Sequence, residues 1–160
     1  MIHHVSIPAR DPAHVAKVLA ELFGGYAGPF IGPFPDSWVV YQEDEHGSGI
    51  EIYPERTQLR PQSEAHASAH MGEAPTGVAF HALVSVKTDR ATIERIGARE
   101  GWVTRHFWRG PPGVKLFELY EFWVENRILL ELATPDMLAG YVRIANGPAQ
   151  RELLARRGAR

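Results

Sequence analysis

The chain has 160 residues, a net charge of −2 and 44% hydrophobic residues, a size that suits one ordinary domain or two small fused modules. The near-neutral charge argues against nucleic acid as a partner, and the absence of cysteine excludes disulfide bonds and thiolate metal sites. No apolar stretch is long enough to cross a membrane and the N-terminus lacks a signal-peptide pattern, so we expect a cytoplasmic protein.

The first part of the chain has the pattern of one strand, one helix and three further strands. Alternating apolar residues predict a strand over 2–9, and Asp11 followed by Pro12 marks the start of a helix that Gly24-Gly25 ends. A short strand near 26–31 and strands over 38–43 and 49–53 follow. We expect this first βαβββ module to occupy residues 1–55.

The second part of the chain repeats this order after a polar segment, residues 56–77, which we predict to be a linker. A strand over 78–86 precedes a helix over 89–100 that is capped by Asp89 or Thr88. A strand over 102–108 and a hairpin of 114–123 with 127–133 complete a second module, residues 78–134. Residues 135–160 are expected to form a C-terminal helical extension, which Gly147-Pro148 breaks.

Each half carries a histidine in its first strand and a glutamate in its last strand. His4 and Glu51 belong to the first half, and His81 and Glu131 stand at nearly the same separation in the second. Side chains alternate along a strand, so each of these residues faces away from its apolar neighbours. Two modules related by a pseudo-twofold axis would bring all four together, and two imidazoles with two carboxylates suit a divalent ion such as Zn, Ni, Co, Fe or Mn.

We therefore predict one divalent metal ion with the ligands His4, Glu51, His81 and Glu131. His3 is an alternative to His4, although strand alternation favours His4 because Val5 and Ile7 have core character. Other acids lie close to Glu51 in the sequence and leave its assignment open: Glu43, Glu45 and Glu55.

The strings around these residues resemble the vicinal oxygen chelate superfamily, also called the glyoxalase/bleomycin-resistance/dioxygenase fold. They are His4-Val5-Ser6-Ile7, Ile50-Glu51-Ile52, His81-Ala82-Leu83-Val84 and Leu130-Glu131-Leu132, and the resemblance covers residues 2–134. It implies an α+β fold in which two βαβββ modules pair into a glyoxalase-like half-barrel. It also implies metal ligands from the first and last strands of each module, which are the same four residues. Glyoxalase I of the bacterial type uses the set His, Glu, His, Glu.

The resemblance implies a metal-dependent isomerase, epimerase or lyase that acts on a small oxygen-chelating substrate through a metal-stabilised enolate. Glu131 or Glu51 would be the catalytic base. An extradiol-type dioxygenase and a metal-free small-molecule binding or resistance protein are the alternatives. Bacterial glyoxalase I has an Arg that holds glutathione where this chain has Pro8, and an Asn where it has Glu55, which counts against lactoylglutathione lyase itself.

Aromatic residues in the second half suggest a substrate pocket. We predict that His106, Trp108 and Trp123 contact the substrate. The alternative is that His106 is a satisfied histidine of the sheet and that the aromatic side chains belong to the core. A homodimer is expected because pairing would bury a sheet edge, and the metal site would be completed either within one chain or across that dimer.

Overall fold

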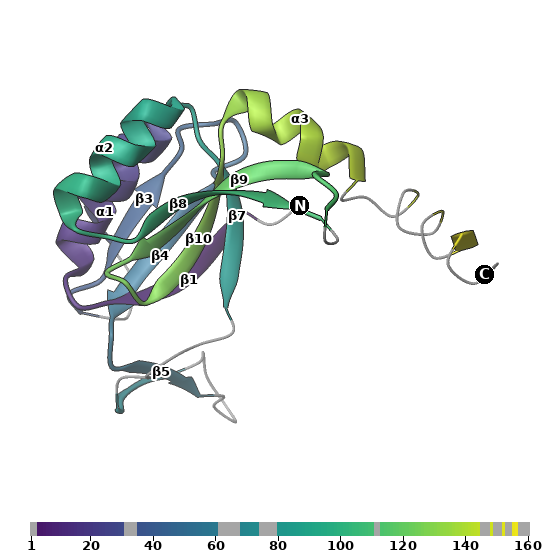
Figure 1. Ribbon diagram of the computed structural model, residues 1–160. Coiled ribbons are helices and arrows are strands. Elements are labelled where there is room, and N and C mark those ends of the chain that lie inside the picture. The colour runs from purple at the N-terminus through teal and green to yellow at the C-terminus, as the bar shows by residue number, and fades with distance from the viewer. Residues whose placement is uncertain are drawn as a thin grey trace.

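Two four-stranded sheets of the same topology form the body of the molecule (Figure 1). The computed structural model describes residues 3–30, 35–60, 68–73, 80–110 and 113–144, with positions 148, 152, 155 and 156. The strand orders are β1-β4-β3-β2 and β7-β10-β9-β8. In each sheet the first strand runs parallel to the last strand of its module, and the other neighbours are antiparallel.

The first half has the predicted order of elements. They are β1 (His4–Ala9), α1 (Pro12–Phe23), β2 (Tyr26–Pro29), β3 (Trp38–Tyr41) and β4 (Gly49–Pro54). Asp11 caps α1, because its carboxylate accepts a hydrogen bond of 2.9 Å from the backbone N–H of His14. Gly24 ends the helix in the left-handed region at φ 62°, where glycine carries no steric penalty.

The second half repeats that order, so the expected pair of βαβββ modules is confirmed. Its elements are β7 (His81–Ser85), α2 (Arg90–Glu100), β8 (Thr104–Arg109), β9 (Phe117–Val124) and β10 (Ile128–Ala133). Asp89, and not Thr88, caps α2 by accepting a 2.8 Å hydrogen bond from Thr92 N. The turn between β9 and β10 falls at Glu125 and Asn126, which adopt φ values of 50° and 57°.

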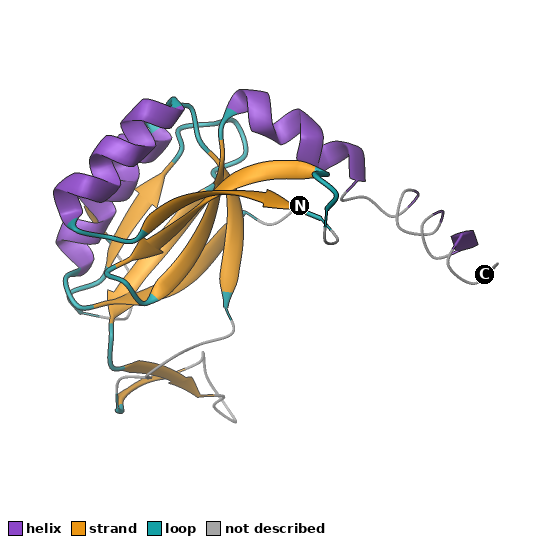
Figure 2. Ribbon diagram, in the orientation of Figure 1, coloured by secondary structure: helices purple, strands orange, loops and turns teal. Residues whose placement is uncertain are grey.

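Two segments lie outside the repeated modules. Within residues 56–77, predicted as a linker, the chain forms an antiparallel hairpin of β5 (Thr57–Arg60) and β6 (Ser68–Met71), which stands apart from the two sheets (Figure 2). After β10, α3 (Pro135–Ile144) packs against β9. The predicted helix break at Gly147-Pro148 involves residues 145–147, which lie outside the described part of the chain.

One face of each sheet packs against the helices and forms the core. Alternate residues of the strands are almost fully buried there, among them Ile7, Ile50, Ile52, Phe122, Leu130 and Leu132. The residues between them point to the opposite face, which is called the open face below. His4, Glu51, His81 and Glu131 all lie on open faces, because each alternates with these buried neighbours.

The two halves contact each other through equivalent segments, as a pseudo-twofold relation requires. At the end of β1 the backbone N–H groups of residues 10 and 11 bond to the Glu125 carboxylate in the β9–β10 turn. At the end of β7 the corresponding contact is made by Lys87 Nζ, which donates to the carbonyl of Gln42 after β3. The expected glyoxalase-like pairing of the modules is thus present within a single chain.

Helices α1 and α2 lie side by side on the same side of the molecule (Figure 1). Ion pairs connect them: His14 with Glu100 at 2.7 Å, and Glu21 with Arg99 at 2.8 Å. In the described part of the chain, no helix is both long and apolar enough to cross a lipid bilayer.

Candidate functional site

The first-half cluster consists of His4, Ser6, Glu51 and Tyr53 on the open face of β1 and β4. These strands are parallel neighbours, and their register pairs Ser6 with Glu51 and His4 with Gly49. Alternation along β1 puts His4 and Ser6 on one face, and alternation along β4 puts Glu51 and Tyr53 on that same face. Four polar side chains therefore meet at one place in the sheet.

The two oxygens of Glu51 have different surroundings. Its Oε2 atom accepts a 3.0 Å hydrogen bond from Ser6 Oγ and another from the Tyr53 hydroxyl. Its Oε1 atom faces His4 Nε2 at 3.7 Å, a distance too long for a hydrogen bond. Since the Glu51 side chain is only 14% exposed, the two hydroxyls hold the carboxylate in place while its other oxygen is turned toward the imidazole.

Tyr53 acts as a neutral donor over the whole physiological pH range. Burial raises the pKa of Tyr53 to about 12, and its hydrogen bond to Glu51 adds to the increase. The phenol keeps its proton next to the carboxylate, so the hydrogen bond does not depend on pH near neutrality.

The second-half cluster consists of Arg109, Glu121 and Glu131 on the open face of β8, β9 and β10. The register pairs Glu131 with Glu121 on β9, and Arg109 reaches both from the end of β8. Its Nη2 atom donates to Glu121 Oε1 and to Glu131 Oε1, each at 2.7 Å. Glu131 therefore has a guanidinium as its partner, whereas Glu51 has two neutral hydroxyls.

A cavity of about 700 Å³ lies between the two halves and is lined by both first-strand histidines. Its walls include His4 and His81, together with the other residues of β7 and residues 48–50. His3, the alternative to His4, also borders this cavity, but its ring nitrogen Nδ1 lies 2.7 Å from the carbonyl of His46. His4, and not His3, is thus the histidine beside Glu51.

A smaller cavity of about 270 Å³ borders the first-half cluster on its other side, toward the β5–β6 hairpin. It is lined by Ser6, Ile7, Pro8, Tyr53, Glu55, Thr57, Gln58 and Glu73. Since His4 lines the larger cavity and Ser6 and Tyr53 line the smaller one, the cluster lies between two spaces open to a small molecule.

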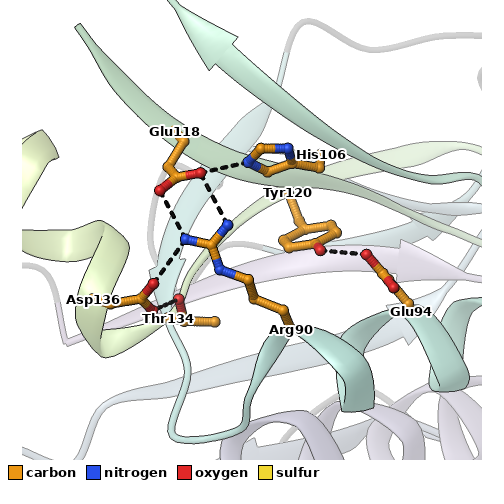
Figure 3. A network of polar contacts seen from close by, with 7 residues as sticks. All are labelled: Arg90, Glu94, His106, Glu118, Tyr120, Thr134 and Asp136. Atoms are coloured by element: carbon orange, nitrogen blue, oxygen red, sulfur yellow. Dashed lines mark hydrogen bonds and ion pairs between the residues drawn. The ribbon is translucent and has the colours of Figure 1, made fainter. Parts of the chain in front are cut away.

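Two of the predicted substrate contacts lie away from the open face. His106 and Trp108 pair with Tyr120 and Glu118 of β9, whose side chains reach α2 (Figure 3). His106 Nε2 lies 2.6 Å from Glu118 Oε2. The structure therefore places these two residues on the helix-covered face, on the other side of the sheet from Glu131.

Trp123 does lie on the open face. The register places it opposite Leu129, and Leu129 opposite His81, so the three form a row across the second sheet. Trp123 is partly buried there. The predicted contacts of His106, Trp108 and Trp123 with a substrate stay predictions.

The four predicted metal ligands do not form one group. In the described ranges of the chain, no three His, Cys, Asp or Glu side chains lie close enough together to hold a metal ion. The first half fits such an ion, because an imidazole and a carboxylate oxygen face each other and the second carboxylate oxygen is held by hydroxyls. The second half is less suited to a metal ion, because Glu131 Oε1 already accepts a hydrogen bond from Arg109.

Sequence reasoning missed four residues of these clusters: Ser6, Tyr53, Arg109 and Glu121. Ser6 and Tyr53 stand two positions after His4 and Glu51, so strand alternation alone could have placed them on the same face. Arg109 and Glu121 carried no such signal, because their places beside Glu131 depend on the register of three strands. That register cannot be read from spacing along the chain.

The arrangement of the two sheets is similar to that of solved glyoxalase-like structures, so the expected fold is confirmed. The structure of lactoylglutathione lyase from Agrobacterium tumefaciens is similar over 84% of this chain and 93% of that chain, with a TM-score of 0.52 and 12% identity. A protein from the mobile metagenome of V. Pseudocholerae is similar over 84% and 94%, with a TM-score of 0.50 and 15% identity. No protein-family model and no curated protein matches the sequence.

Proposed function

We propose that the chain is a metal-dependent glyoxalase-like enzyme, an isomerase, epimerase or lyase that acts on a small oxygen-chelating substrate. The observation that carries this proposal is the pair of His4 Nε2 and Glu51 Oε1, 3.7 Å apart on an open face between two cavities. One oxygen of this partly buried carboxylate is held by two hydroxyls, and the other faces His4. Such a carboxylate is suited to accept a proton from a bound molecule.

His4 and Glu51 would hold the metal ion in this proposal, with His81 on the wall of the same cavity. When bound, a divalent ion supplies a Lewis acid that stabilises negative charge on a substrate oxygen. The chain's own contribution is positional: Ser6 and Tyr53 fix the Glu51 carboxylate, and their neutral hydroxyls leave its charge uncancelled. Glu51 is the better candidate for the proton-transferring base, because Glu131 is already paired with Arg109.

A metal-free small-molecule binding protein is the second candidate. The observation in its favour is the ion pair of Arg109 with Glu131, which leaves the four-residue set incomplete. Such a protein would bind a small molecule in the same cavities without catalysing a reaction.

Metal content and proton exchange separate the two candidates. Protein purified without chelator is expected to contain about one divalent ion per chain, as measured by inductively coupled plasma mass spectrometry. In D2O it is expected to exchange the α-proton of one or more members of a panel of α-hydroxy ketones and α-keto acids, followed by NMR.

Glu51→Gln should abolish that exchange, while the control Glu45→Gln, at a carboxylate that is 86% exposed in a turn, should not change it. A protein without metal whose ligand binding is unaffected by Glu51→Gln would establish the binding protein instead.

A further inference from the structure

Two equivalent glutamates have different hydrogen-bond partners in the two halves. Glu51 and Glu131 occupy the same place in their modules, each on the last strand and each 14% exposed. The neighbour of Glu51 across the parallel pair is Ser6, whereas the neighbour of Glu131 is Leu83. The second half thus lacks the hydroxyl that holds Glu51.

A guanidinium takes the place of those hydroxyls in the second half. Arg109 bridges Glu121 and Glu131 through one nitrogen, at 2.7 Å to each, and its side chain is 36% exposed. Its guanidinium carbon also lies 5.8 Å from the centre of the Phe107 ring. Burial acts to lower the pKa of Arg109, but the bonds to Glu131 and Glu121 outweigh it, so the cation is retained.

A divalent cation and this guanidinium cannot share Glu131 without cost. A metal ligated by Glu131 would lie within a few ångströms of a second positive charge, or Arg109 would have to give up two charge-assisted hydrogen bonds. At Glu51 neither cost arises, because the Ser6 and Tyr53 hydroxyls that donate to its carboxylate are neutral.

We propose that the Arg109 ion pair withdraws Glu131 from the metal ligands, so that the first half, through His4 and Glu51, is the half that binds a cation. This inference rests on the proposed function for the presence of a metal. It assigns Arg109 a positioning role: the residue determines which of two equivalent carboxylates is available.

Titration with Co²⁺, followed by its visible absorption, tests the proposal without an activity assay. Glu51→Gln should weaken Co²⁺ binding about tenfold or more, whereas Glu131→Gln should leave it within about twofold of the original protein. Arg109→Met should strengthen binding, because it frees Glu131 and removes a nearby positive charge. Arg105→Met is the control for the loss of charge alone. Arg105 lies on the same strand and face, opposite Glu121 in the register, but forms no ion pair with a described residue, so its effect should be much smaller than that of Arg109→Met.

Equal losses of affinity in Glu131→Gln and Glu51→Gln would overturn the inference, and so would an unchanged affinity in Arg109→Met. If the original protein binds no Co²⁺, the proposed function fails, and so does the assignment of the cation to the first half. A gain of binding in Arg109→Met would then support only the withdrawal of Glu131 by Arg109.

A second measurement needs no metal at all. Urea unfolding in the presence of EDTA is compared for Arg109→Met, Glu131→Gln and the double variant. The midpoint shift of the double variant should be smaller than the two single shifts combined. Additive shifts would show that Arg109 does not hold Glu131, and the inference would be wrong whatever the Co²⁺ result.

Discussion

At the scale of single residues, the account depends on how Glu51 is held. Ser6 and Tyr53 both donate to one of its oxygens, and this leaves the other oxygen facing His4. The arrangement holds a carboxylate in a partly buried place with neutral hydroxyls as its hydrogen-bond donors. Such a group is available to a proton or to a metal ion.

The tyrosine in this cluster predicts a loss of stability in alkali. The pKa of Tyr53 is raised by burial from 10.0 to about 12 in the folded protein, so the folded state binds its proton more tightly than the unfolded state does. The resulting stability is complete below pH 10 and is lost as the pH rises toward 12. Urea unfolding measured from about pH 8 to about pH 12 should show this decline.

Tyr53→Phe should cost about 1 kcal/mol near neutral pH, because the Glu51 hydrogen bond is lost, and it should make the alkaline decline shallower. Burial also raises the pKa of Tyr120 to about 12, so part of the decline should persist in that variant. A decline of unchanged steepness would show that Tyr53 is not a protonated donor to Glu51.

Much of this cluster follows from the sequence by alternation along two strands. The positions of His4 and Glu51 in apolar strands were enough to put both on the open face. The environment of His106 was not predictable in the same way. Its sequence position allowed either face of β8, and only the register with Tyr120 and Glu118 places it beside Glu118, on the face from which Glu118 reaches α2. Contacts along one strand can be read from spacing, and contacts across several strands cannot.

At the scale of elements, the close fit of α2 against β8 depends on one glycine. A Cβ atom at Gly97 would lie 2.0 Å from Thr104 Oγ1 and 2.7 Å from Thr104 Cβ. Gly97→Ala should therefore destabilise the protein by about 1–3 kcal/mol, because the helix must move away from the strand.

Gly140→Ala in α3 is the matched control. There the nearest atom to the added Cβ is Phe117 Cβ at 3.4 Å, and the higher helix propensity of alanine should stabilise by about 1 kcal/mol or less. Urea midpoints of the two variants should thus shift in opposite directions. A shift of the same sign in both would contradict the packing described for α2.

The elements α2, β9 and α3 are tied together by Arg90 (Figure 3). Its guanidinium forms a two-pronged pair with Glu118, at 3.0 and 2.7 Å, and a third bond of 2.7 Å to Asp136 at the start of α3. The Arg90 hydrogen bonds lower the pKa of Glu118, and the Thr134 hydroxyl followed by Arg90 lowers the pKa of Asp136 to about 2.

This network predicts a loss of stability in acid. Both carboxyl groups have a lower pKa in the folded than in the unfolded protein, so their contribution is present above the ordinary values of 4.5 and 3.8 and is lost as the pH falls through them toward 2. Arg90→Met should make the urea midpoint less dependent on pH in this range, whereas Arg105→Met should not. Identical acid profiles for Arg90→Met and the original protein would contradict the network.

At the scale of the whole molecule, the duplicated order of elements explains why the architecture could be predicted. The helices are capped by Asp11 and Asp89 and end at Gly24 and Gly101, and each module closes with an antiparallel strand pair. These features follow local rules that operate equally in each half. The β5–β6 hairpin was not expected, because the segment between the modules has a polar composition without clear strand alternation. The divergence of the two clusters was only partly visible in the sequence, because Ser6 corresponds to Leu83 within the repeated strings, whereas Arg109 lies outside them.

A homodimer stays a proposal at this scale. In the described part of the molecule the outer strands β2 and β8 carry exposed aromatic side chains, with Tyr26 at 55%, Phe107 at 37% and Trp108 at 44%. Pairing of such an edge in two copies would cover these residues. Light scattering after size-exclusion chromatography is expected to give twice the chain mass of 17.9 kDa.

The central claim is that the first half, and not the second, provides the cation-binding carboxylate. It is tested most directly by a crystal structure of the protein soaked with Co²⁺, with diffraction recorded at the cobalt absorption edge. The account predicts an anomalous peak within about 2.3 Å of His4 Nε2 and Glu51 Oε1, with Arg109 still bonded to Glu131. A peak on Glu131 with Arg109 displaced, or no peak beside Glu51, would contradict it.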